Sequence, residues 1–195
     1  MLSNKKYLAE KILDPLVKPL AKVNPNTLTL LGIIPSILFF VSIINHQYLL
    51  AIIAFAGNIF DLIDGAAARK FNKVTKFGGV LDSTFDRISD FLIISAFGFA
   101  GIVGWEIVAT LLLFSFLISY IRSRGELANP SISLSIGVIE RTERLFSIAI
   151  TLILFMLFPS FKMENFNVVE IGFIILLILS FYTIIQRLIY LYKKL

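Results

Sequence analysis

Residues 61–86 read DLIDGAAARKFNKVTKFGGVLDSTFD, and this stretch decides how the rest of the chain is arranged. It places two pairs of aspartates, Asp61 with Asp64 and Asp82 with Asp86, at the end of one apolar segment and the start of the next. The spacings i,i+3 and i,i+4 put each pair on one face of a helix. Clustered carboxylates are the ligands that Mg²⁺, Mn²⁺ or Ca²⁺ prefers. The pattern therefore predicts a divalent-metal site where two helix ends meet.

Small residues within the same stretch predict room for a nucleotide. Gly65 and Ala68 follow Asp64 on nearly the same helical face and let a flat or bulky ligand approach the backbone. Arg69 adds a planar fork of donors suited to a phosphate or a base edge, and Gly78 opens the opposing helix in the same way. Asp86 lies one turn deeper than Asp82, so we expect it to act as the general base as well as a metal ligand.

Read together, these positions spell D-x2-D-G-x2-A-R-x8-G-x3-D-x3-D, which is eight fixed positions over 26 residues. This pattern resembles the signature of the CDP-alcohol phosphotransferase family. The resemblance implies transfer of a phosphatidyl-type group from a CDP-lipid to an alcohol, with release of CMP. It also implies a homodimer and two Mg²⁺ ions, for which Mn²⁺ is a possible substitute, held by Asp61, Asp64, Asp82 and Asp86.

The segment 25–29, PNTLT, resembles the same family, in which the Asn and Thr face the nucleotide. A helix cap is the alternative role for Asn26. The CDP-lipid contacts implied by the resemblance are Asn26, Thr29, Asp61, Asp64, Gly65, Ala68, Arg69, Gly78 and Asp82.

The composition predicts an all-α integral membrane protein. Hydrophobic residues make up 57% of the 195 residues, 19 are Phe and only 16% are charged, which is more apolar surface than a soluble domain can bury. Apolar runs of about 20 residues predict six transmembrane helices, because each such helix spans the hydrocarbon core. They are expected at 27–44, 48–69, 79–101, 105–124, 142–159 and 167–190. We expect a single domain over 1–195, with a six-helix bundle over 25–195.

Residues 1–24 alternate lysines with apolar residues at helical spacing. This predicts an amphipathic helix lying along the lipid surface, although a short cytosolic helix packed on the protein would give the same pattern. The chain has no cysteine, so disulfides and thiolate metal sites are excluded.

The basic residues predict the orientation. Of the 18 Lys and Arg residues, only Lys162 falls on the far side of the predicted spans. By the positive-inside rule, both termini and the aspartate site are expected to be cytoplasmic in a multi-pass protein of the cell membrane. The net charge of +5 on that face suits anionic lipid headgroups and phosphorylated substrates, and nothing in the chain indicates a nucleic-acid-binding fold.

A second polar stretch combines SYIRSRGE at 119–126 with GVIERTERL at 137–145. Arg122, Arg141 and Arg144 would form a cationic pocket for a phosphate monoester, oriented by Glu140 and Glu143. A solvated loop with local ion pairs is the alternative.

The pattern SYxRxRxE followed by GxxERxER resembles one branch of the family. That branch makes phosphatidylinositol phosphate, or its archaeal ether-lipid counterpart, from inositol phosphate. The resemblance implies that Arg122, Arg141 or Arg144, and Arg187 in IIQRLIY bind the acceptor phosphate.

Other interpretations are compatible with the sequence. The acceptor alcohol would be glycerol 3-phosphate or serine in other branches of the family. Asn58-x2-Asp61-x2-Asp64 is superficially similar to a membrane prenyltransferase motif, but that family has a longer chain and wider Asp spacing. A divalent cation transporter would scatter its acids along a path, and a lipid scaffold without catalysis would not need all four. Asp90 falls outside the signature, where Arg87 or a supporting hydrogen bond would explain it.

Overall fold

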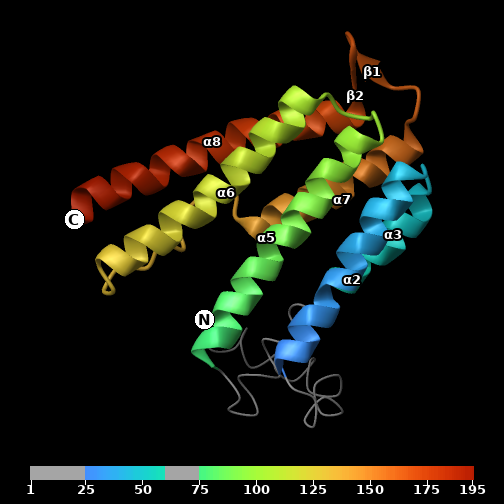
Figure 1. Ribbon diagram of the computed structural model, residues 1–195. Coiled ribbons are helices and arrows are strands. Elements are labelled where there is room, and N and C mark those ends of the chain that lie inside the picture. The colour runs from blue at the N-terminus through green and yellow to red at the C-terminus, as the bar shows by residue number, and fades with distance from the viewer. Residues whose placement is uncertain (1–24, 60–74) are drawn as a thin grey trace, which may run out of the picture.

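The computed structural model of the protein describes residues 25–59 and 75–195 (Figure 1). Its helices are α2 (Pro25–Ile44), α3 (Tyr48–Ala56), the short 3-10 helix η2 (Gly57–Ile59), α5 (Lys76–Phe99), α6 (Trp105–Ala128), α7 (Arg141–Leu157) and α8 (Val168–Lys194). The strands described are β1 (Lys162–Met163) and β2 (Phe166–Asn167), which form an antiparallel hairpin between α7 and α8. The helical class predicted from the sequence is confirmed. The α-helix predicted at 48–69 begins as expected but ends at Ala56, where the 3-10 helix η2 follows. The predicted interfacial helix at 1–24 and the rest of the second apolar segment lie outside the described residues.

The helices pack as two groups joined through α5 and α7. Figure 1 shows α2 (blue) beside α5 (green), and α6 (yellow) beside α8 (red), and both pairs are in extensive contact. α7 packs on α8 and also reaches α3, while α5 contacts α6. Helices that are far apart in the sequence are therefore neighbours, and α5 and α7 lie where the two groups meet.

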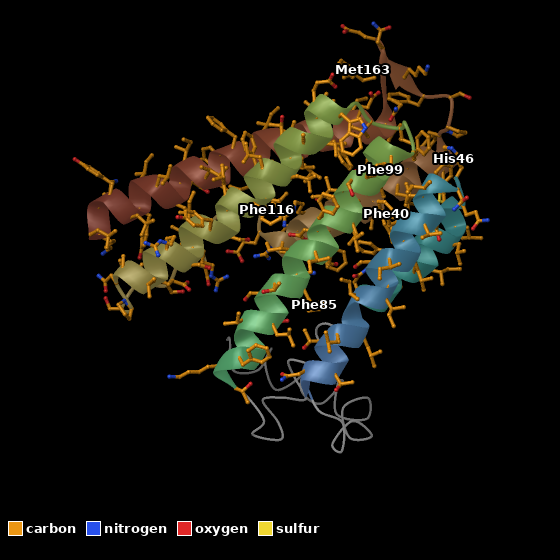
Figure 2. The ribbon with its side chains drawn as sticks, in the orientation of Figure 1. Phe40, His46, Phe85, Phe99, Phe116 and Met163 are labelled. Carbon is orange, nitrogen blue, oxygen red and sulfur yellow. The ribbon has the colours of Figure 1, made fainter. Side chains whose placement is uncertain are left out.

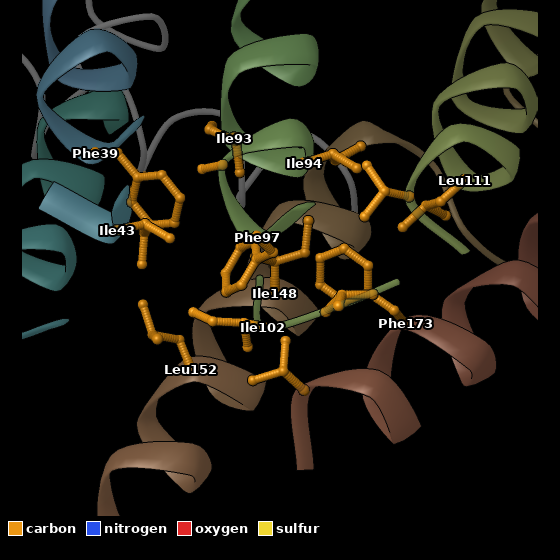
Figure 3. Packing of buried hydrophobic residues seen from close by; sticks show 14 of the residues in the cluster. Phe39, Ile43, Ile93, Ile94, Phe97, Ile102, Leu111, Ile148, Leu152 and Phe173 are labelled. Atoms are coloured by element: carbon orange, nitrogen blue, oxygen red, sulfur yellow. The ribbon is translucent and has the colours of Figure 1, made fainter. Parts of the chain in front are cut away.

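The apolar core lies toward the C-terminal end of α5, which is the end nearest the β1–β2 hairpin in Figure 1. Figure 3 shows how its side chains pack. Phe97 contacts Phe39 of α2 and Phe173 of α8, with ring centroids 6.0 and 5.0 Å apart. Ile148 and Leu152 complete the cluster from α7 and are fully buried. Close-packed aromatic and branched side chains fill this end of the bundle, and every charged residue of α5 lies between Lys76 and Asp90, before the apolar part of the helix.

Large apolar side chains also cover the outer faces of the bundle. α2 exposes Leu31 and Leu38, and α8 exposes Ile178, Phe181 and Leu188, each by about half or more of its surface. Contiguous apolar exposure of this kind is typical of surfaces that meet lipid or a partner. Among the described residues, α6 and α8 are long and apolar enough to cross a membrane, and Thr29–Ile44 forms a shorter apolar helix.

Side-chain caps fix where two of the helices begin. Thr75 Oγ1 accepts a hydrogen bond from the backbone N–H of Gly78 at 2.9 Å and starts α5. Asn167 accepts from the N–H groups of Val169 and Glu170 and starts α8. Its Nδ2 also donates to Ile102 O at 2.8 Å, which ties the start of α8 to the turn after α5.

Candidate active site

A narrow crevice between α2 and α5 brings together residues that the sequence assigns to nucleotide and metal binding. Asp82 and Asp86 line it from α5, and Thr29 lines it from α2. The other lining residues are Gly32, Ile33, Phe85 and Ser89. Figure 2 shows Phe85 on the half of α5 that is far from His46 and Met163, which lie at the opposite end of the bundle. The crevice is therefore at the end of the molecule where α2 and α5 begin.

Asn26 and Gly78 lie against each other at this end. A methyl group added at Gly78 would lie 3.2 Å from Asn26 Oδ1 and 2.9 Å from Thr75 Oγ1. The missing side chain thus leaves space for Asn26 beside the N-terminus of α5. Five of the predicted site residues are brought together here, namely Asn26, Thr29, Gly78, Asp82 and Asp86.

Asp86 joins this crevice to the arginine-rich segment at the start of α7. Its Oδ1 lies 2.8 Å from Arg141 Nη1, and its Oδ2 lies 3.7 Å from Arg87 Nη2. The Asp86 and Arg141 side chains are 22% and 21% exposed, so the pair is accessible to a solute from one side. Two motifs that are far apart in the sequence therefore meet at one ion pair.

Asp90, one turn beyond Asp86, is the most heavily bonded carboxylate described. Its Oδ2 accepts from Arg144 Nη2 at 2.7 Å and from Ser115 Oγ at 3.1 Å. Its Oδ1 accepts from Arg141 Nε at 3.3 Å, and Arg87 Nε lies 3.8 Å from Oδ2. Only 1% of the side chain is exposed, so this carboxylate depends on its partners for solvation.

Arg144 is as deeply buried as the aspartate that it contacts. Its side chain is 1% exposed, and one of its three guanidinium nitrogens bonds Asp90. The other two, Nε and Nη1, have no hydrogen-bond partner among the described residues. A buried donor without an acceptor lowers the stability of the fold. An anion or another acceptor that hydrogen-bonds these two nitrogens would remove that cost.

Arg187 connects the end of the chain to the same region through a fully engaged guanidinium. Its three nitrogens donate to Ile136 O at 2.8 Å, to Ile118 O at 2.6 Å and to Glu140 Oε1 at 2.8 Å. Glu140 is the N-cap of α7 and directly precedes Arg141, so Arg187 holds the start of α7 against α6 and α8. Glu143 accepts from the backbone N–H of Glu140 in the same capping box.

Arg122 is the most exposed of the four predicted acceptor arginines. Its Nε donates to Glu126 Oε1 at 3.2 Å, and 44% of its side chain is exposed. It lies one turn after Ile118, the residue whose carbonyl accepts from Arg187. Arg122 and Arg187 are therefore neighbours, whereas Arg141 and Arg144 form a second group around Asp90.

A buried polar contact also holds η2 beside this site. Ser36 of α2 donates to Asn58 Oδ1 at 2.9 Å and is hydrogen-bonded to Ser89 of α5. Ser89 lies on α5 about one helical turn after Asp86. Asn58 comes three residues before Asp61 in the sequence, so the chain leaves the described part of the structure close to the acidic crevice.

A larger open cavity of about 800 Å³ lies on the other side of α5, facing α6. Lys76 and Arg87 line it together with the apolar side chains of Phe91 and Phe116. Five hydroxyl-bearing residues also line it, namely Ser83, Thr84, Ser119, Tyr120 and Ser123. This cavity is thus separated from the acidic crevice by the helix that carries the aspartates.

The described carboxylates supply half of the predicted metal-binding set. Asp82 and Asp86 present hard oxygen donors one turn apart in the same crevice, which fits a divalent cation. Within 25–59 and 75–195, no group of three acidic or histidine side chains comes close enough to hold an ion. The other two predicted ligands, Asp61 and Asp64, lie outside the described residues, as do Gly65, Ala68 and Arg69.

Sequence reasoning left Asp90 outside the site because the signature ends at Asp86. The signal that could have found it is its place one turn further along the same helical face, together with a motif carrying two arginines three residues apart. A carboxylate among that many potential cations has a partner more often than not. Only the folded packing shows which arginines those partners are.

Comparison with known proteins identifies relatives of this chain. A family model described as CDP-alcohol phosphatidyltransferase matches residues 22–186. The archaetidylinositol phosphate synthase of Pyrococcus horikoshii is 38% identical over 190 residues, covering 96% of this chain and 94% of that protein. The phosphatidylinositol phosphate synthase of Mycobacteroides abscessus is 35% identical over 152 residues, covering 69% of this chain and 65% of that protein.

Two solved structures resemble the described fold. Both are crystal structures of the phosphatidylinositol phosphate synthase of Mycobacterium tuberculosis, at 26% identity. The one with CDP-DAG bound has a TM-score of 0.79 and covers 93% of this chain and 94% of that chain. The one in complex with manganese and citrate has a TM-score of 0.77 and covers 92% and 88%.

Proposed function

The chain belongs to the CDP-alcohol phosphatidyltransferase family, and from that premise we propose that this transferase acts on a CDP-lipid and an inositol phosphate. The lipid phosphate group is transferred to a hydroxyl of the inositol phosphate, and CMP is released. The relatives named as archaetidylinositol phosphate and phosphatidylinositol phosphate synthases support this choice of acceptor.

The observation that carries the proposal is the ion pair between Asp86 and Arg141, 2.8 Å apart. Asp86 is the residue that we assign as general base, and Arg141 belongs to the segment that we assign to the acceptor phosphate. An acceptor whose phosphate is bound by Arg141 would have its hydroxyl within reach of Asp86. Such positioning lowers the barrier by holding the reacting groups close together before the reaction.

The proposed mechanism divides the roles between the two sides of the crevice. Asn26, Thr29, Gly65, Ala68, Arg69 and Gly78 bind the cytidine diphosphate. Asp61, Asp64, Asp82 and Asp86 would hold two Mg²⁺ or Mn²⁺ ions, which when bound neutralise charge that develops on the pyrophosphate. Arg122, Arg141, Arg144 and Arg187 form the surroundings of the acceptor phosphate.

The transfer step forms one phosphorus–oxygen bond and breaks another. The acceptor hydroxyl oxygen forms a bond to the β-phosphorus of the CDP-lipid, and Asp86 takes its proton. The bond between that phosphorus and the bridging oxygen breaks, and the bridging oxygen leaves with its electron pair as part of CMP. A carboxylate that also binds a cation is a weak base. Asp86 would therefore need to lie close to the acceptor hydroxyl, and a bound metal ion would make that hydroxyl easier to deprotonate.

The protein is membrane-associated, as the long apolar helices α6 and α8 and its family indicate. We further propose six spans, a surface helix at 1–24, a homodimer, and cytoplasmic placement of both termini and of the site. The lipid tails then stay in the bilayer while CDP and the acceptor enter from the cytosol. Single cysteines introduced into this cysteine-free chain, and labelled from one side of sealed vesicles, would test the orientation.

The decisive experiment measures CMP release by the purified protein in lipid, with a panel of acceptors and with both CDP-diacylglycerol and CDP-archaeol. We expect inositol phosphate to be the preferred acceptor, and a chelator to abolish turnover that Mg²⁺ or Mn²⁺ restores. Preference for glycerol 3-phosphate, serine or free inositol would refute the acceptor assignment. Full CMP release in the presence of chelator would refute the metal assignment.

A further inference from the structure

The structure assigns a role to Asp90 that the family signature does not cover. This carboxylate is contacted by side chains from three helices besides its own backbone neighbours: Arg87 from α5, Ser115 from α6, and Arg141 and Arg144 from α7. The exposed fraction of its side chain is 1%. A buried carboxylate is retained only where its hydrogen bonds offset the loss of hydration, and here two of the three hydrogen bonds come from arginines in the segment that follows Gly137.

We propose that Asp90 is a positioning residue for the acceptor phosphate, which it aligns by holding Arg141 and Arg144 in fixed orientations. This inference rests on the proposed function, since it concerns the acceptor of that reaction. Asp90 would touch neither the acceptor nor the CDP-lipid. It acts through the two arginines.

The orientation of Arg144 supports this role. Asp90 Oδ2 holds Nη2 of Arg144 at 2.7 Å, while Nε and Nη1 of the same guanidinium have no hydrogen-bond partner among the described residues. Each buried donor without an acceptor costs stability, and two on one guanidinium are therefore available to a ligand that brings its own acceptors. Each of these two donors on one rigid, planar group can bind a phosphate oxygen, and the bond from Nη2 to Asp90 fixes the directions in which they point.

The position of Arg141 supports it independently. Its Nε donates to Asp90 at 3.3 Å, and its Nη1 contacts Asp86 at 2.8 Å. The guanidinium therefore bridges two carboxylates that lie one turn apart on α5. Because the proposed base and the anchor of the arginines share one helix, the distance from the bound phosphate to the base is set by the rigid backbone of α5.

The test replaces Asp90 by Asn, which keeps the size and one oxygen acceptor but removes the charge. We expect the KM for the acceptor to rise about tenfold or more, as for loss of a charge-assisted contact, while the KM for CDP-lipid changes by about twofold or less. The matched control is Glu170→Gln in the capping box of α8, at the hairpin end of the bundle. This substitution removes the carboxylate that accepts a hydrogen bond from Asn167 N at the start of α8. It should leave both KM values within about twofold of the unmodified protein.

Two further variants keep the inference testable if Asp90→Asn folds poorly. Ser115→Ala removes one neutral hydrogen bond to Asp90 Oδ2 and should raise the acceptor KM by a smaller factor with the same selectivity between the two substrates. In a background of Arg144→Gln, the substitution Asp90→Asn should add less to the acceptor KM than it does alone, because one of the two groups through which it acts is already gone. Thermal unfolding of each variant measures the stability cost separately.

An unchanged acceptor KM in Asp90→Asn, or equal rises in both KM values, would overturn the inference. So would full additivity with Arg144→Gln. Failure of the proposed function is a separate result: the unmodified protein would then not release CMP with inositol phosphate. If another phosphorylated acceptor supports turnover, the same KM comparison is made with that acceptor. Preference for an acceptor without a phosphate would overturn the role of Asp90 as well.

Discussion

At the scale of single residues, Asp82 and Asp86 occupy the same crevice but have different surroundings. Asp82 is exposed, while Asp86 contacts Arg141 and Arg87 and is partly buried. The two are one turn apart on the same helix, so substitutions at them form a matched pair. Their different surroundings imply different contributions to binding and to transfer.

We therefore predict that Asp86→Asn retains CDP-lipid binding but loses the transfer step, because the proton acceptor is removed. Asp82→Asn should weaken both metal-dependent stabilisation and CDP-lipid binding. Binding is measured by titration with CDP-lipid in the presence of Mg²⁺, and transfer by CMP release. Equal loss of binding in both variants would mean that Asp86 acts mainly as a ligand.

Arg122 and Arg124 form a second matched pair, two positions apart on α6 and hence on different faces. We predict that Arg122→Gln raises the acceptor KM about tenfold to a hundredfold, because a contact worth roughly 1.5 to 3 kcal/mol is lost. Arg124→Gln should change it by about twofold or less. Initial rates at varied acceptor concentration distinguish the two. Similar rises in both would indicate a general effect of positive charge rather than a specific contact.

The residues of the crevice were predictable because each is part of a local pattern. Asn26, Thr29, Gly78, Asp82 and Asp86 were chosen by spacing and by resemblance, and the structure brings all five to one end of α2 and α5. The partners of the arginines were not predictable in the same way. Arg187 was expected to bind the acceptor, and the packing adds that its guanidinium already holds Glu140 and two backbone carbonyls.

At the scale of helices, sequence reasoning predicted the described ends to within about four residues, except that the helix expected at 48–69 ends as α3 at Ala56 and is followed by η2. The apolar runs determine where a helix exists, and caps determine where it starts. Thr75 starts α5 earlier than the apolar run alone indicates. The β1–β2 hairpin was not predicted, since its strands are two residues long and carry no alternating pattern that would distinguish them from a turn.

The loop that leads into α7 packs closely against Thr183 of α8. Gly137 has a φ of 149°, and a methyl group there would lie 2.5 Å from Thr183 Cγ2. Thr183 Oγ1 accepts from Ile139 N at 3.1 Å, so the same contact holds the loop that presents Glu140 and Arg141. Displacing this loop would displace the acceptor arginines.

We predict that Gly137→Ala lowers the free energy of unfolding by roughly 1 to 3 kcal/mol, the cost of a strained backbone position. It should also raise the acceptor KM. The control is Gly79→Ala, where an added methyl group meets nothing within 4 Å. Thermal unfolding and initial rates measure the two effects. A Gly137→Ala protein as stable and as active as the control would mean that the loop tolerates a side chain.

At the scale of the whole molecule, alternating helices made it predictable that the charged motifs meet at one end. They did not indicate which helices are neighbours. The pairing of α2 with α5 and of α6 with α8 depends on shape complementarity between apolar faces that are nearly uniform in Ile, Leu and Phe. The separation of the polar half of α5 from the apolar core follows from that pairing, because the core closes around Phe97 and leaves the first turns of α5 to the polar residues.

The buried contact between Asp90 and Arg144 has a consequence for how the chain is made. The two residues are 54 positions apart, so at a synthesis rate of roughly 5 to 20 residues per second α5 leaves the ribosome about 3 to 11 s before Arg144 is made. Until then the cation nearest to Asp90 on α5 is Arg87, at 3.8 Å in the folded protein. During that interval the nascent helix carries a carboxylate that a lipid environment disfavours. In the six-span arrangement proposed above, we expect α5 to complete its integration only when α7 arrives, so that a nascent chain that stops before Arg141 keeps α5 at the membrane surface or beside the translocation machinery.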